Sequence, residues 1–257
     1  MHFAPLRMTI FTYSYFEMDT SRAIRINAFL ASAGLGSRRS VEKLILEGKI
    51  TVNGQVVRNL ALRVDAQKDR VFCENKPVVP LEFQYVMFHK PRGCGCTRHD
   101  PHGAKTIYDV LPSQLRHLAH AGRLDVDSEG LLLLSNDGAW VAQITHPRHG
   151  VKKIYEVEVE GAPNKDSLSR ALGGVQSGSE LLKAESAEVM KCFRGKSWLK
   201  VSLAEGRNRE IRRIFGALKH SVIRLKRVAI GNLGLGGLKT GGWRNLTPDE
   251  IRLFEGK

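Results

Sequence analysis

The stretch AGRLDVDSEGLLLLSNDG, residues 121–138, predicts a buried strand that is entered through an acidic loop. Four consecutive leucines at 131–134 favour a strand in the core. Directly ahead of them, an arginine-led segment carries the carboxylates Asp125, Asp127 and Glu129. The chain has 40 Lys and Arg residues against 26 Asp and Glu residues, so carboxylates at the mouth of its core call for a functional explanation.

The composition bounds the possible functions. A length of 257 residues allows one large domain or a small domain beside a medium-sized one, and a hydrophobic share of 42% suits a globular core. The formal net charge of +14 points to a polyanionic partner, either a nucleic acid or an anionic membrane surface. No run approaches the roughly 18 apolar residues of a membrane span. Four scattered cysteines do not make a disulfide framework, which favours a reduced cytoplasm.

The N-terminal residues 1–21 lack a clean apolar segment and a small-residue cleavage site, so they do not predict a signal peptide. We expect a disordered extension there, with Met18 as an alternative start.

Residues 22–80 predict a small unit that begins with two helices. The first helix is predicted from four apolar residues at helical spacing, Ile26, Phe29, Leu30 and Ala33, which would form one apolar stripe. Gly34 ends that helix, and Ser37 is placed to cap the second one, which ends at Gly48. The apolar stripe of the second helix consists of Val41, Leu44 and Ile45.

A hairpin and a linker are predicted to complete this unit. The segment KITVNGQVV, residues 49–57, alternates about Asn53-Gly54, which is a strong hairpin signal. The Pro-punctuated stretch ENKPVVPLE, residues 74–82, is interpreted as a linker that closes the unit near residue 80.

Two arginines in the second helix indicate a ligand. Arg38 and Arg39 occupy its first turn, where the helix dipole disfavours each cation by roughly 0.3–1 kcal/mol. Free N–H groups, a capping serine and two arginines suit a bound phosphate. Residues 22–80 hold eleven Lys or Arg against five Asp or Glu, and a solvated basic face is the alternative explanation. The placement favours RNA binding, with Arg38, Arg39 and Lys43 as contacts.

Residues 84–257 predict an α+β domain around a mixed, mostly antiparallel sheet, because strands outnumber helices and many can pair as hairpins. Strands are expected in FQYVMFHKPRG (83–93), LLLLSNDG (131–138), KKIYEVEVEG (152–161) and SWLKVSLAEG (197–206). In the third of these, Tyr155, Val157 and Val159 alternate with three glutamates. NREIRRIFGALK (208–219) predicts a helix whose core stripe is Ile211, Ile214, Phe215 and Leu218.

These segments resemble known families. Residues 22–80 resemble an S4 RNA-binding domain, with Asn27 where lysine is usual. Residues 84–257 resemble the catalytic domain of the RsuA/RluB family of pseudouridine synthases, which modify uridines in ribosomal RNA. Five segments carry the resemblance in order: HKPRG to TIYDVLP (89–112), HAGRLDVDSEGLLLLSNDG (120–138), KIYEVEV (153–159), EGRNREIRRIFGALK (205–219) and LGGLKTGGWRNLTPDE (235–250). GLGSRRSVEKLI (34–45) and DPHGAKTIYDVLP (100–112) resemble the B-type enzymes, which act on large-subunit RNA, more than the A-type enzymes, which act on small-subunit RNA.

The resemblance implies roles for individual residues. The catalytic aspartate falls on Asp125, the tyrosine that stacks on the base and handles a proton on Tyr155, and the arginine that pairs with the aspartate on Arg212. A hydrophobic wall residue corresponds to Leu225. Arg123 and Leu124 are expected to line the same substrate pocket.

The sequence also departs from the family pattern. Glu210 stands where glutamine is usual, and Lys219 stands where a glycine commonly closes the helix. Neither position is one of the three catalytic ones, so these departures bear on rate or target more than on chemistry. Asp127 and Glu129 are interpreted as solvent-facing turn residues.

The chemistry of pseudouridine formation fits these residues. The reaction breaks the N1–C1′ bond, turns the uracil and rejoins it to the same carbon through C5, which needs no redox cofactor, nucleotide or metal. It needs a carboxylate, either as nucleophile or as base toward a glycal intermediate, and the sequence leaves both routes open. A bidentate arginine stabilises the charged carboxylate and orients it.

Other readings of the sequence are weaker. Cys94, Cys96, His99 and His102 lie close together, but their C-x-C spacing does not match a zinc site, and a loop beside an RNA cleft is preferred. A glycosidase needs a second carboxylate that no motif supplies. The Gly-rich segment 230–242 has neither a GKS/T ending nor a G-x-G-x-x-G that opens a helix, and tight turns between short strands are expected.

Basic residues near the C-terminus are candidates for RNA contacts. Residues 207–227 contain eight Lys or Arg and one acid, Glu210. Four of them are predicted to contact backbone phosphates of the RNA: Arg207, Arg209, Arg213 and Arg227. The sequence therefore predicts a monomeric, S4-containing rRNA pseudouridine synthase that acts on a flipped-out uridine, in 23S rRNA rather than 16S rRNA. The alternative from another class is a catalytically idle ribosome-assembly factor that only binds RNA.

Overall fold

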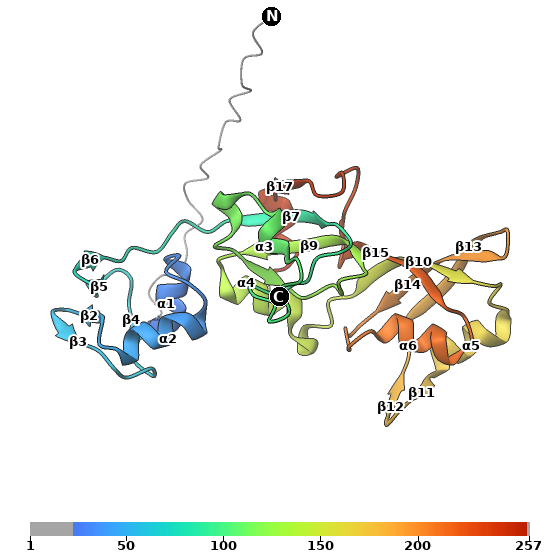
Figure 1. The fold of residues 1–257 in the computed structure, drawn as a ribbon, viewed down its shortest axis with the longest axis horizontal. Helices are drawn as coiled ribbons and strands as arrows, with labels where there is room; N and C mark the ends of the chain where they lie inside the picture. The colour runs from blue at the N-terminus through green and yellow to red at the C-terminus, as the bar shows by residue number, and fades with distance from the viewer. Residues whose placement is uncertain (1–22, 256–257) are drawn as a thin grey trace, which may run out of the picture. The chain divides into compact units, whose positions relative to one another are not determined.

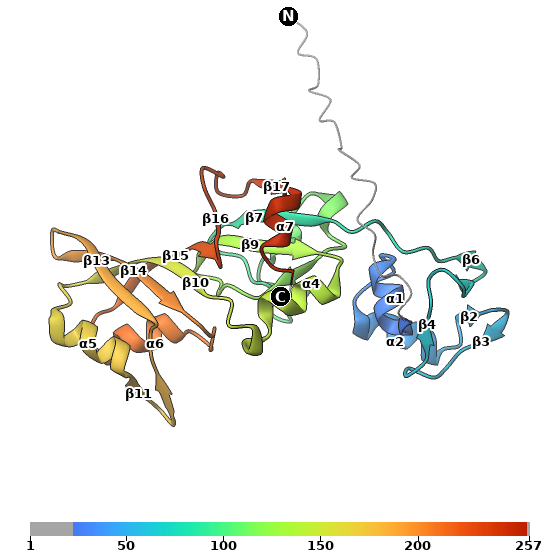
Figure 2. The same ribbon diagram turned by 180° about the vertical axis from the view of Figure 1, so that it is seen from behind.

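The computed structural model describes residues 23–255, and their contacts divide into two units at Leu81 and Glu82 (Figures 1 and 2). The extension expected over residues 1–21 lies outside the described residues. Within residues 23–255, no helix combines the length and the apolar character needed to span a membrane.

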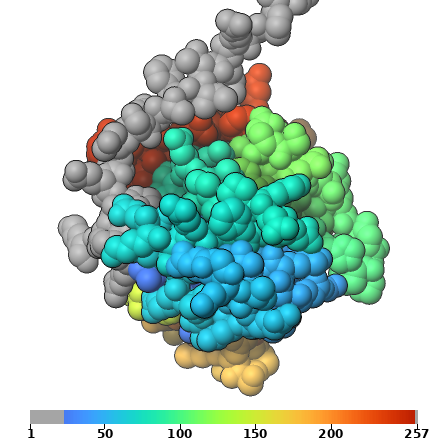
Figure 3. Space-filling view, turned by 90° about the vertical axis from the view of Figure 1, so that its left-hand side faces the viewer, coloured from blue at the N-terminus to red at the C-terminus, as the bar shows by residue number. Residues whose placement is uncertain are grey.

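The N-terminal unit has the two predicted helices, α1 (Ile26–Ser32) and α2 (Arg38–Leu46). Four short strands form an antiparallel sheet in the order β3-β2-β5-β6: β3 (Gln55–Val56), β2 (Ile50–Val52), β5 (Val71–Cys73) and β6 (Lys76–Pro77). A separate pair joins β1 (Ile24–Arg25) to β4 (Arg63–Val64). In Figure 3 the blue and blue-green atoms of this unit face the viewer.

Local signals in this unit predicted its elements well. The Ser37 hydroxyl accepts a hydrogen bond from the backbone N–H of Ser40, so it caps α2 as expected. Asn53 and Gly54 have φ angles of 53° and 83°, the left-handed pair that a two-residue hairpin turn requires. The predicted stripes of both helices lie in one core, which includes Ile26, Phe29, Leu30, Val41 and Ile45.

The interpretation of residues 74–82 as a linker was wrong for the first half of that stretch. Glu74 and Asn75 have positive φ angles and form the turn between β5 and β6. Pro77 is tolerated because β6 is an edge strand, where a missing N–H costs no ladder bond. Val78 is only 8% exposed and belongs to the core of the unit.

The C-terminal unit is built on a nine-stranded sheet with the path β13-β14-β10-β15-β9-β7-β17, with β8 added on β9 and β16 on β15. Its long strands are β13 (Ser186–Phe193), β14 (Lys196–Leu203), β10 (Lys153–Glu160), β15 (Val222–Ile230), β9 (Glu129–Ser135) and β7 (Tyr85–Lys90). The short ones are β8 (Ala119–Ala121), β16 (Leu233–Gly234) and β17 (Trp243–Asn245). Among these described strands only β15 and β9 pair in parallel, so the prediction of a mixed, mostly antiparallel sheet is confirmed.

Helices cover both faces of this sheet (Figure 1). They are α3 (Ile107–Val110), α4 (Gly138–Thr145), α5 (Lys165–Gly173), α6 (Glu210–Ala217) and α7 (Pro248–Arg252), with short 3-10 turns at Ser113–Leu115 and Pro147–His149. A small hairpin of β11 (Val175–Ser177) and β12 (Glu180–Leu182) lies beside α6.

The four leucines of β9 divide between two cores. Leu131 and Leu133 pack in a cluster with Met87, Trp140 and Ile230, whereas Leu132 and Leu134 pack with Phe88, Ile107 and Leu118 on the other face. Because successive side chains of a strand point to opposite faces, a strand covered on both sides needs an unbroken apolar run. After this strand, the Asp137 carboxylate accepts the N–H groups of Ala139 and Trp140 and caps α4.

The half of the sheet next to α5 and α6 has one covered face. Tyr155, Val157 and Val159 of β10 are buried, in alternation with glutamates, and they pack in one cluster with the predicted stripe of α6. Both predictions are confirmed.

Candidate active site

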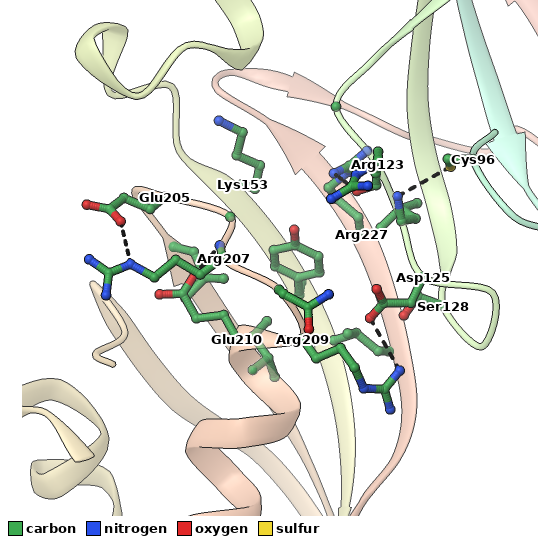
Figure 4. A pocket seen from close by; sticks show the side chains of 18 of the residues that line it. Cys96, Arg123, Asp125, Ser128, Lys153, Glu205, Arg207, Arg209, Glu210 and Arg227 are labelled. Carbon is green, nitrogen blue, oxygen red and sulfur yellow. Dashed lines mark hydrogen bonds and ion pairs between the residues drawn. The ribbon is translucent and has the colours of Figure 1, made fainter. Parts of the chain in front are cut away.

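A cavity of about 650 Å³ opens between the loop that connects β8 to β9 and the loop that precedes α6 (Figure 4). The first loop contributes Arg123, Leu124 and Asp125, and the second contributes residues 204–209. Strands β10 and β15 contribute Tyr155, Leu225 and Arg227. The structure thus brings together segments that are up to about a hundred residues apart, with the predicted catalytic aspartate and tyrosine lining the same space.

A buried lysine holds the backbone of the first loop. The Lys90 ammonium is 0% exposed and donates to the main-chain oxygens of Asp125 (3.0 Å), Ser128 (2.8 Å) and Pro91 (3.1 Å). Burial lowers the pKa of Lys90, and nearby acidic groups, Asp125 and Asp127 among them, partly oppose that change. Our sequence reasoning missed this residue. Its signal was a lysine at the end of a buried strand, where a charge requires partners.

Arg227 holds the same loop from β15. Its Nε donates to the oxygen of Leu131 at 2.7 Å and its Nη1 to the oxygen of Arg123 at 3.3 Å. The strands approach so closely here that a Cβ on Gly130 would lie 2.2 Å from the Arg227 oxygen. Gly130 also has a φ of +115°, a conformation that side chains rarely adopt.

The predicted ion pair of Arg212 with Asp125 is replaced by a longer chain of contacts. Arg212 Nη2 lies 3.1 Å from Asp127 Oδ2 and donates to the Asp127 oxygen, while its Nη1 donates to the oxygen of Val222. Asp125 is instead paired with Arg209, whose Nη1 lies 3.7 Å from Asp125 Oδ2 (Figure 4). Burial lowers the pKa of Arg212, and Asp127 opposes that change. The difference has a structural reason: Asp127 stands on the same loop as Asp125, and its carboxylate is the one that faces the half-buried guanidinium of Arg212.

The two acids interpreted as solvent-facing turn residues have partners. Glu129 is only 5% exposed, begins β9 and forms an ion pair with Arg224. Asp127 is paired with both Arg209 and Arg212. For Glu129 the interpretation was wrong, because its partner comes from β15, which only the tertiary fold brings near. Asp127 does lie in a turn with 39% of its side chain exposed, and the fold adds its ion pairs with Arg209 and Arg212.

The expected pocket residues line the cavity with different exposures. Tyr155 is 7% exposed, and Leu124 and Leu225 are each 6% exposed in the cluster beneath it. Arg123 is exposed. The Leu124 N–H donates to the Cys96 Sγ at 3.4 Å, and burial raises the pKa of that thiol. Cys96 therefore serves as an acceptor in the wall of the cavity.

The four arginines that were predicted to contact RNA backbone phosphates have different surroundings. Arg207 and Arg209 lie at the exposed rim of the cavity, although Arg207 also pairs with Glu205 at 2.8 Å. Arg213 is turned toward the β11–β12 hairpin, where it pairs with Glu180 at 2.7 Å and bonds Ser177. Arg227 is 3% exposed, which differs from the expectation of a phosphate contact and fits an anchor of the loop.

In the N-terminal unit, Arg38, Arg39 and Lys43 are all exposed on α2. Lys43 pairs with Glu47 at 3.8 Å, a weak surface contact. Within residues 23–255, Arg38 and Arg39 have no ion pair. Their guanidinium groups therefore lie open at the N-terminus of α2.

The two departures from the family pattern have clear structural settings. Glu210 is 6% exposed and its Oε2 accepts the Arg207 N–H at 3.0 Å, and burial raises its pKa. Lys219 has a φ of +65° at the end of α6, with its N–H bonded to the Gly216 oxygen and the His220 N–H to the Phe215 oxygen. This is the Schellman geometry, in which glycine is usual because its Cβ penalty is absent.

Within residues 23–255, no three His, Cys, Asp or Glu side chains are grouped so that they could hold a metal ion. Cys94 is buried at 1% exposure, while Cys96 lines the cavity.

Comparisons with known proteins agree on both units. Residues 84–217 match the family described as RNA pseudouridylate synthase, and residues 24–71 match the S4 domain. The chain is 39% identical to an uncharacterised RNA pseudouridine synthase of Aquifex aeolicus, across 90% of this chain and 94% of that one. It is 36% identical to the ribosomal large subunit pseudouridine synthase B of Bacillus subtilis, across 89% and 94% of the two chains. A solved pseudouridylate synthase superimposes with a TM-score of 0.63 at 30% identity, covering 91% of this chain and 100% of that one.

Proposed function

Since the chain belongs to the RNA pseudouridylate synthases and carries an S4 domain, we propose that it converts one uridine of 23S rRNA to pseudouridine with Asp125 as the catalytic group. One observation carries the proposal for the residue. Asp125 lines the cavity on a loop whose backbone is held by two buried cations, Lys90 and Arg227, with Tyr155 in the same cavity. A fixed carboxylate beside an aromatic ring is what the reaction requires.

In the proposed reaction, the carboxylate of Asp125 acts at the anomeric carbon or at its neighbour, and the N1–C1′ bond breaks. The freed uracil turns in the cavity, a bond forms between C5 and C1′, and the proton of C5 is lost while N1 gains one. The substrate and the product are isomers, so no electrons are supplied or removed.

The surroundings of Asp125 support the other roles. Tyr155 is buried except where it lines the cavity. This position suits a ring that stacks on the turning base and a hydroxyl that accepts the proton lost from C5. Leu225 and Leu124 offer an apolar wall. Arg212 contacts the loop through its ion pair with Asp127. The arginine that pairs with the Asp125 carboxylate is Arg209.

The choice of RNA rests on the resemblance and on charge. The Bacillus subtilis relative is named for the large ribosomal subunit, which supports 23S over 16S rRNA. Exposed arginines at the cavity rim and on α2 suit backbone phosphates, which orient RNA without reading its sequence. A target uridine must leave its stack to reach Asp125, so an unpaired or bulged uridine is the expected substrate. We propose that the enzyme acts as a monomer.

Mapping of pseudouridines in rRNA from cells with and without the gene tests the proposal. We expect one 23S position to lose its modification and to regain it with the wild-type gene but not with Asp125→Asn. Loss at a 16S position would refute the choice of RNA. Restoration by Asp125→Asn would refute the role of Asp125, and an unchanged map would favour the idle assembly factor.

Purified protein separates binding from chemistry. The amide of Asp125→Asn preserves size but removes the charge, so RNA affinity should stay within a few fold of wild type while turnover disappears. Residual activity above about one per cent of wild type would count against Asp125 as the catalytic group.

A further inference from the structure

Three cations line the cavity without an acidic partner. Lys153 begins β10, Arg123 stands on the loop that precedes β9, and Arg227 lies on β15. Within residues 23–255, none of the three forms an ion pair with a carboxylate. Arg207 and Arg209, which line the same cavity, are both paired with acids. Cations that no protein carboxylate compensates indicate a place for a negatively charged part of the substrate.

The guanidinium of Arg227 has an unused donor. Arg227 is 3% exposed, and its Nε and Nη1 donate to the main-chain oxygens of Leu131 and Arg123. Its Nη2 is buried and has no hydrogen-bond partner among the described residues. Because both acceptors are neutral carbonyls, the positive charge of Arg227 is not cancelled and acts on the cavity above it.

Lys153 brings an ammonium group to the same space from apolar surroundings. Its neighbours on the adjacent strands are Leu203 and Ile230, which are 3% and 1% exposed. Its Nζ donates to the main-chain oxygen of Ile144 at 3.3 Å, which leaves further N–H donors free for a ligand. Burial lowers the pKa of Lys153, and the charge of Arg227 lowers it further. An anionic partner would therefore stabilise this ammonium.

Lys153 lies beside the expected position of the base. Lys153 and Tyr155 are two residues apart on β10, so their side chains leave the strand on the same face, about 7 Å apart. Arg227 is opposite Tyr155 in the pairing of β10 with β15. Figure 4 shows Lys153 on the other side of the cavity from Asp125. A uracil that stacks on Tyr155 with its sugar at Asp125 therefore turns its distal edge, which carries O4, toward Lys153.

We propose that Lys153 is a catalytic residue that binds O4 of the target uracil and stabilises the negative charge of the base when the N1–C1′ bond breaks. This inference rests on the proposed function. In both routes open to Asp125, the electron pair of the broken bond leaves with N1 and spreads through C6, C5 and C4 to O4. The same pair then forms the C5–C1′ bond. A cation at O4 speeds the reaction because it binds the charged base more strongly than neutral uridine.

The depth of the site favours the base over a backbone phosphate. Arg207 and Arg209, at the exposed rim, are placed for phosphates. Lys153 is only partly exposed and lies between buried apolar side chains, and Arg227 is buried beneath the cavity. The low dielectric of such a site strengthens the attraction between a cation and a charge that develops during the reaction.

Lys153→Met tests the proposal, because it removes the charge and keeps an unbranched side chain. At saturating RNA the single-turnover rate on uridine should fall about a hundredfold, while RNA affinity stays within about threefold of wild type. With 5-fluorouridine at the target position the loss should shrink to about tenfold or less, because fluorine itself stabilises the uracil anion. Digestion of the RNA and quantification of the remaining N1-linked nucleoside measure both rates.

Three further variants serve as controls. Lys152→Met removes the same charge from the exposed neighbour, which pairs with Glu185 at 3.6 Å, and should stay within about twofold of the wild-type rate on both substrates. Lys153→Arg keeps the charge and should recover about tenfold of the lost rate. Lys153→Gln keeps a donor for the Ile144 oxygen without the charge, and it repeats the test if Lys153→Met fails to fold.

Equal fold losses on the two substrates would assign Lys153 a structural role, and a rate within about threefold of wild type would remove it from the reaction. Weaker RNA binding with an unchanged rate at saturation would identify a phosphate contact. Each of these results overturns the inference and leaves the proposed function intact. A wild type that modifies no rRNA would refute the proposed function, and this inference with it.

Discussion

The ammonium nitrogen of Lys90 lies 3.0 Å from the main-chain oxygen of Asp125, so a fully buried cation fixes the backbone of the residue to which the chemistry is assigned. The same ammonium donates to the main-chain oxygen of Ser128, so it holds the loop at two points that are three residues apart. Its partners are carbonyl oxygens, so the side-chain charge of Asp125 stays directed at the cavity and is not neutralised by Lys90.

Lys90→Met should destabilise the protein and slow the reaction together. The apolar side chain fills the space but leaves buried carbonyls unpaired, at a cost of about 1–3 kcal/mol. We expect the chemical step to slow at least tenfold as the loop loosens. Urea denaturation and single-turnover kinetics measure both effects. Exposed Lys105 provides the control, since Lys105→Met should change neither quantity.

Gly130→Ala should cost about 3 kcal/mol or more in unfolding free energy, because the new Cβ meets the backbone of Arg227 and the φ angle is unfavourable. Gly178 also has a positive φ, of 63°, but open space around it, so Gly178→Ala should cost only about 1–2 kcal/mol. Equal losses of stability in the two variants would contradict the close approach of β9 and β15.

Glu210→Gln should stabilise the protein in a pH-dependent way. Burial raises the pKa of Glu210 above its ordinary value of 4.5, so its stabilising contribution is present below that pH and is lost as the pH rises through the raised pKa. Glutamine keeps the acceptor for the Arg207 N–H without the charge. Melting temperatures measured from pH 4 to pH 8 should show a gain over wild type at neutral pH that vanishes toward pH 4. A gain independent of pH would rule out the charge as its cause.

Lys219→Gly should raise the unfolding free energy by about 0.5–1 kcal/mol, because glycine adopts the left-handed conformation without a Cβ penalty. The greater conformational entropy of glycine in the unfolded chain offsets only part of this gain. Ala217→Gly, in the last turn of the same helix, should be destabilising. The comparison separates the terminal geometry from a general effect of glycine on α6.

Arg38→Gln with Arg39→Gln should weaken RNA binding and leave chemistry intact at saturating RNA. Each lost phosphate contact lowers the slope of log K against log salt by roughly 0.7–0.9. Folding should not suffer, since two cations leave the positive end of α2. Binding titrations across a salt series, beside single-turnover kinetics, test both halves.

The control for this pair is Arg58→Gln with Arg70→Gln, which removes the same charge from exposed positions outside the α2 N-terminus. An equal change of slope in both double variants would identify a general charge effect. Normal binding with slow chemistry in the α2 variant would contradict the division of labour between the two units.

Short-range patterns predicted most of the fold, because they report what neighbouring residues do. The leucine run of β9, the Asn53-Gly54 turn and the apolar stripe of α6 each depend on periodicity or turn chemistry within about ten residues. The short strand β6 escaped prediction because an edge strand can hold a proline, which ordinarily signals a linker.

The partners of the charged residues were decided by the tertiary structure. Sequence motifs alone pointed to Asp125, Tyr155 and the arginines at positions 207 and 209 as candidate site residues, since the motifs depend on residue type and order, and these residues line one cavity. The contact of Arg212 with Asp127 spans 85 residues, that of Arg224 with Glu129 spans 95, and that of Arg227 with Leu131 spans 96. All three arise where α6 and β15 meet the start of β9, and the parallel pairing of β15 with β9 sets the register that brings Arg227 opposite Gly130. The sequence does not show which partner a charged side chain will meet, because that depends on how distant strands pair. For this reason Glu129 and Arg227 were predicted to lie at the surface, whereas both are buried in the fold.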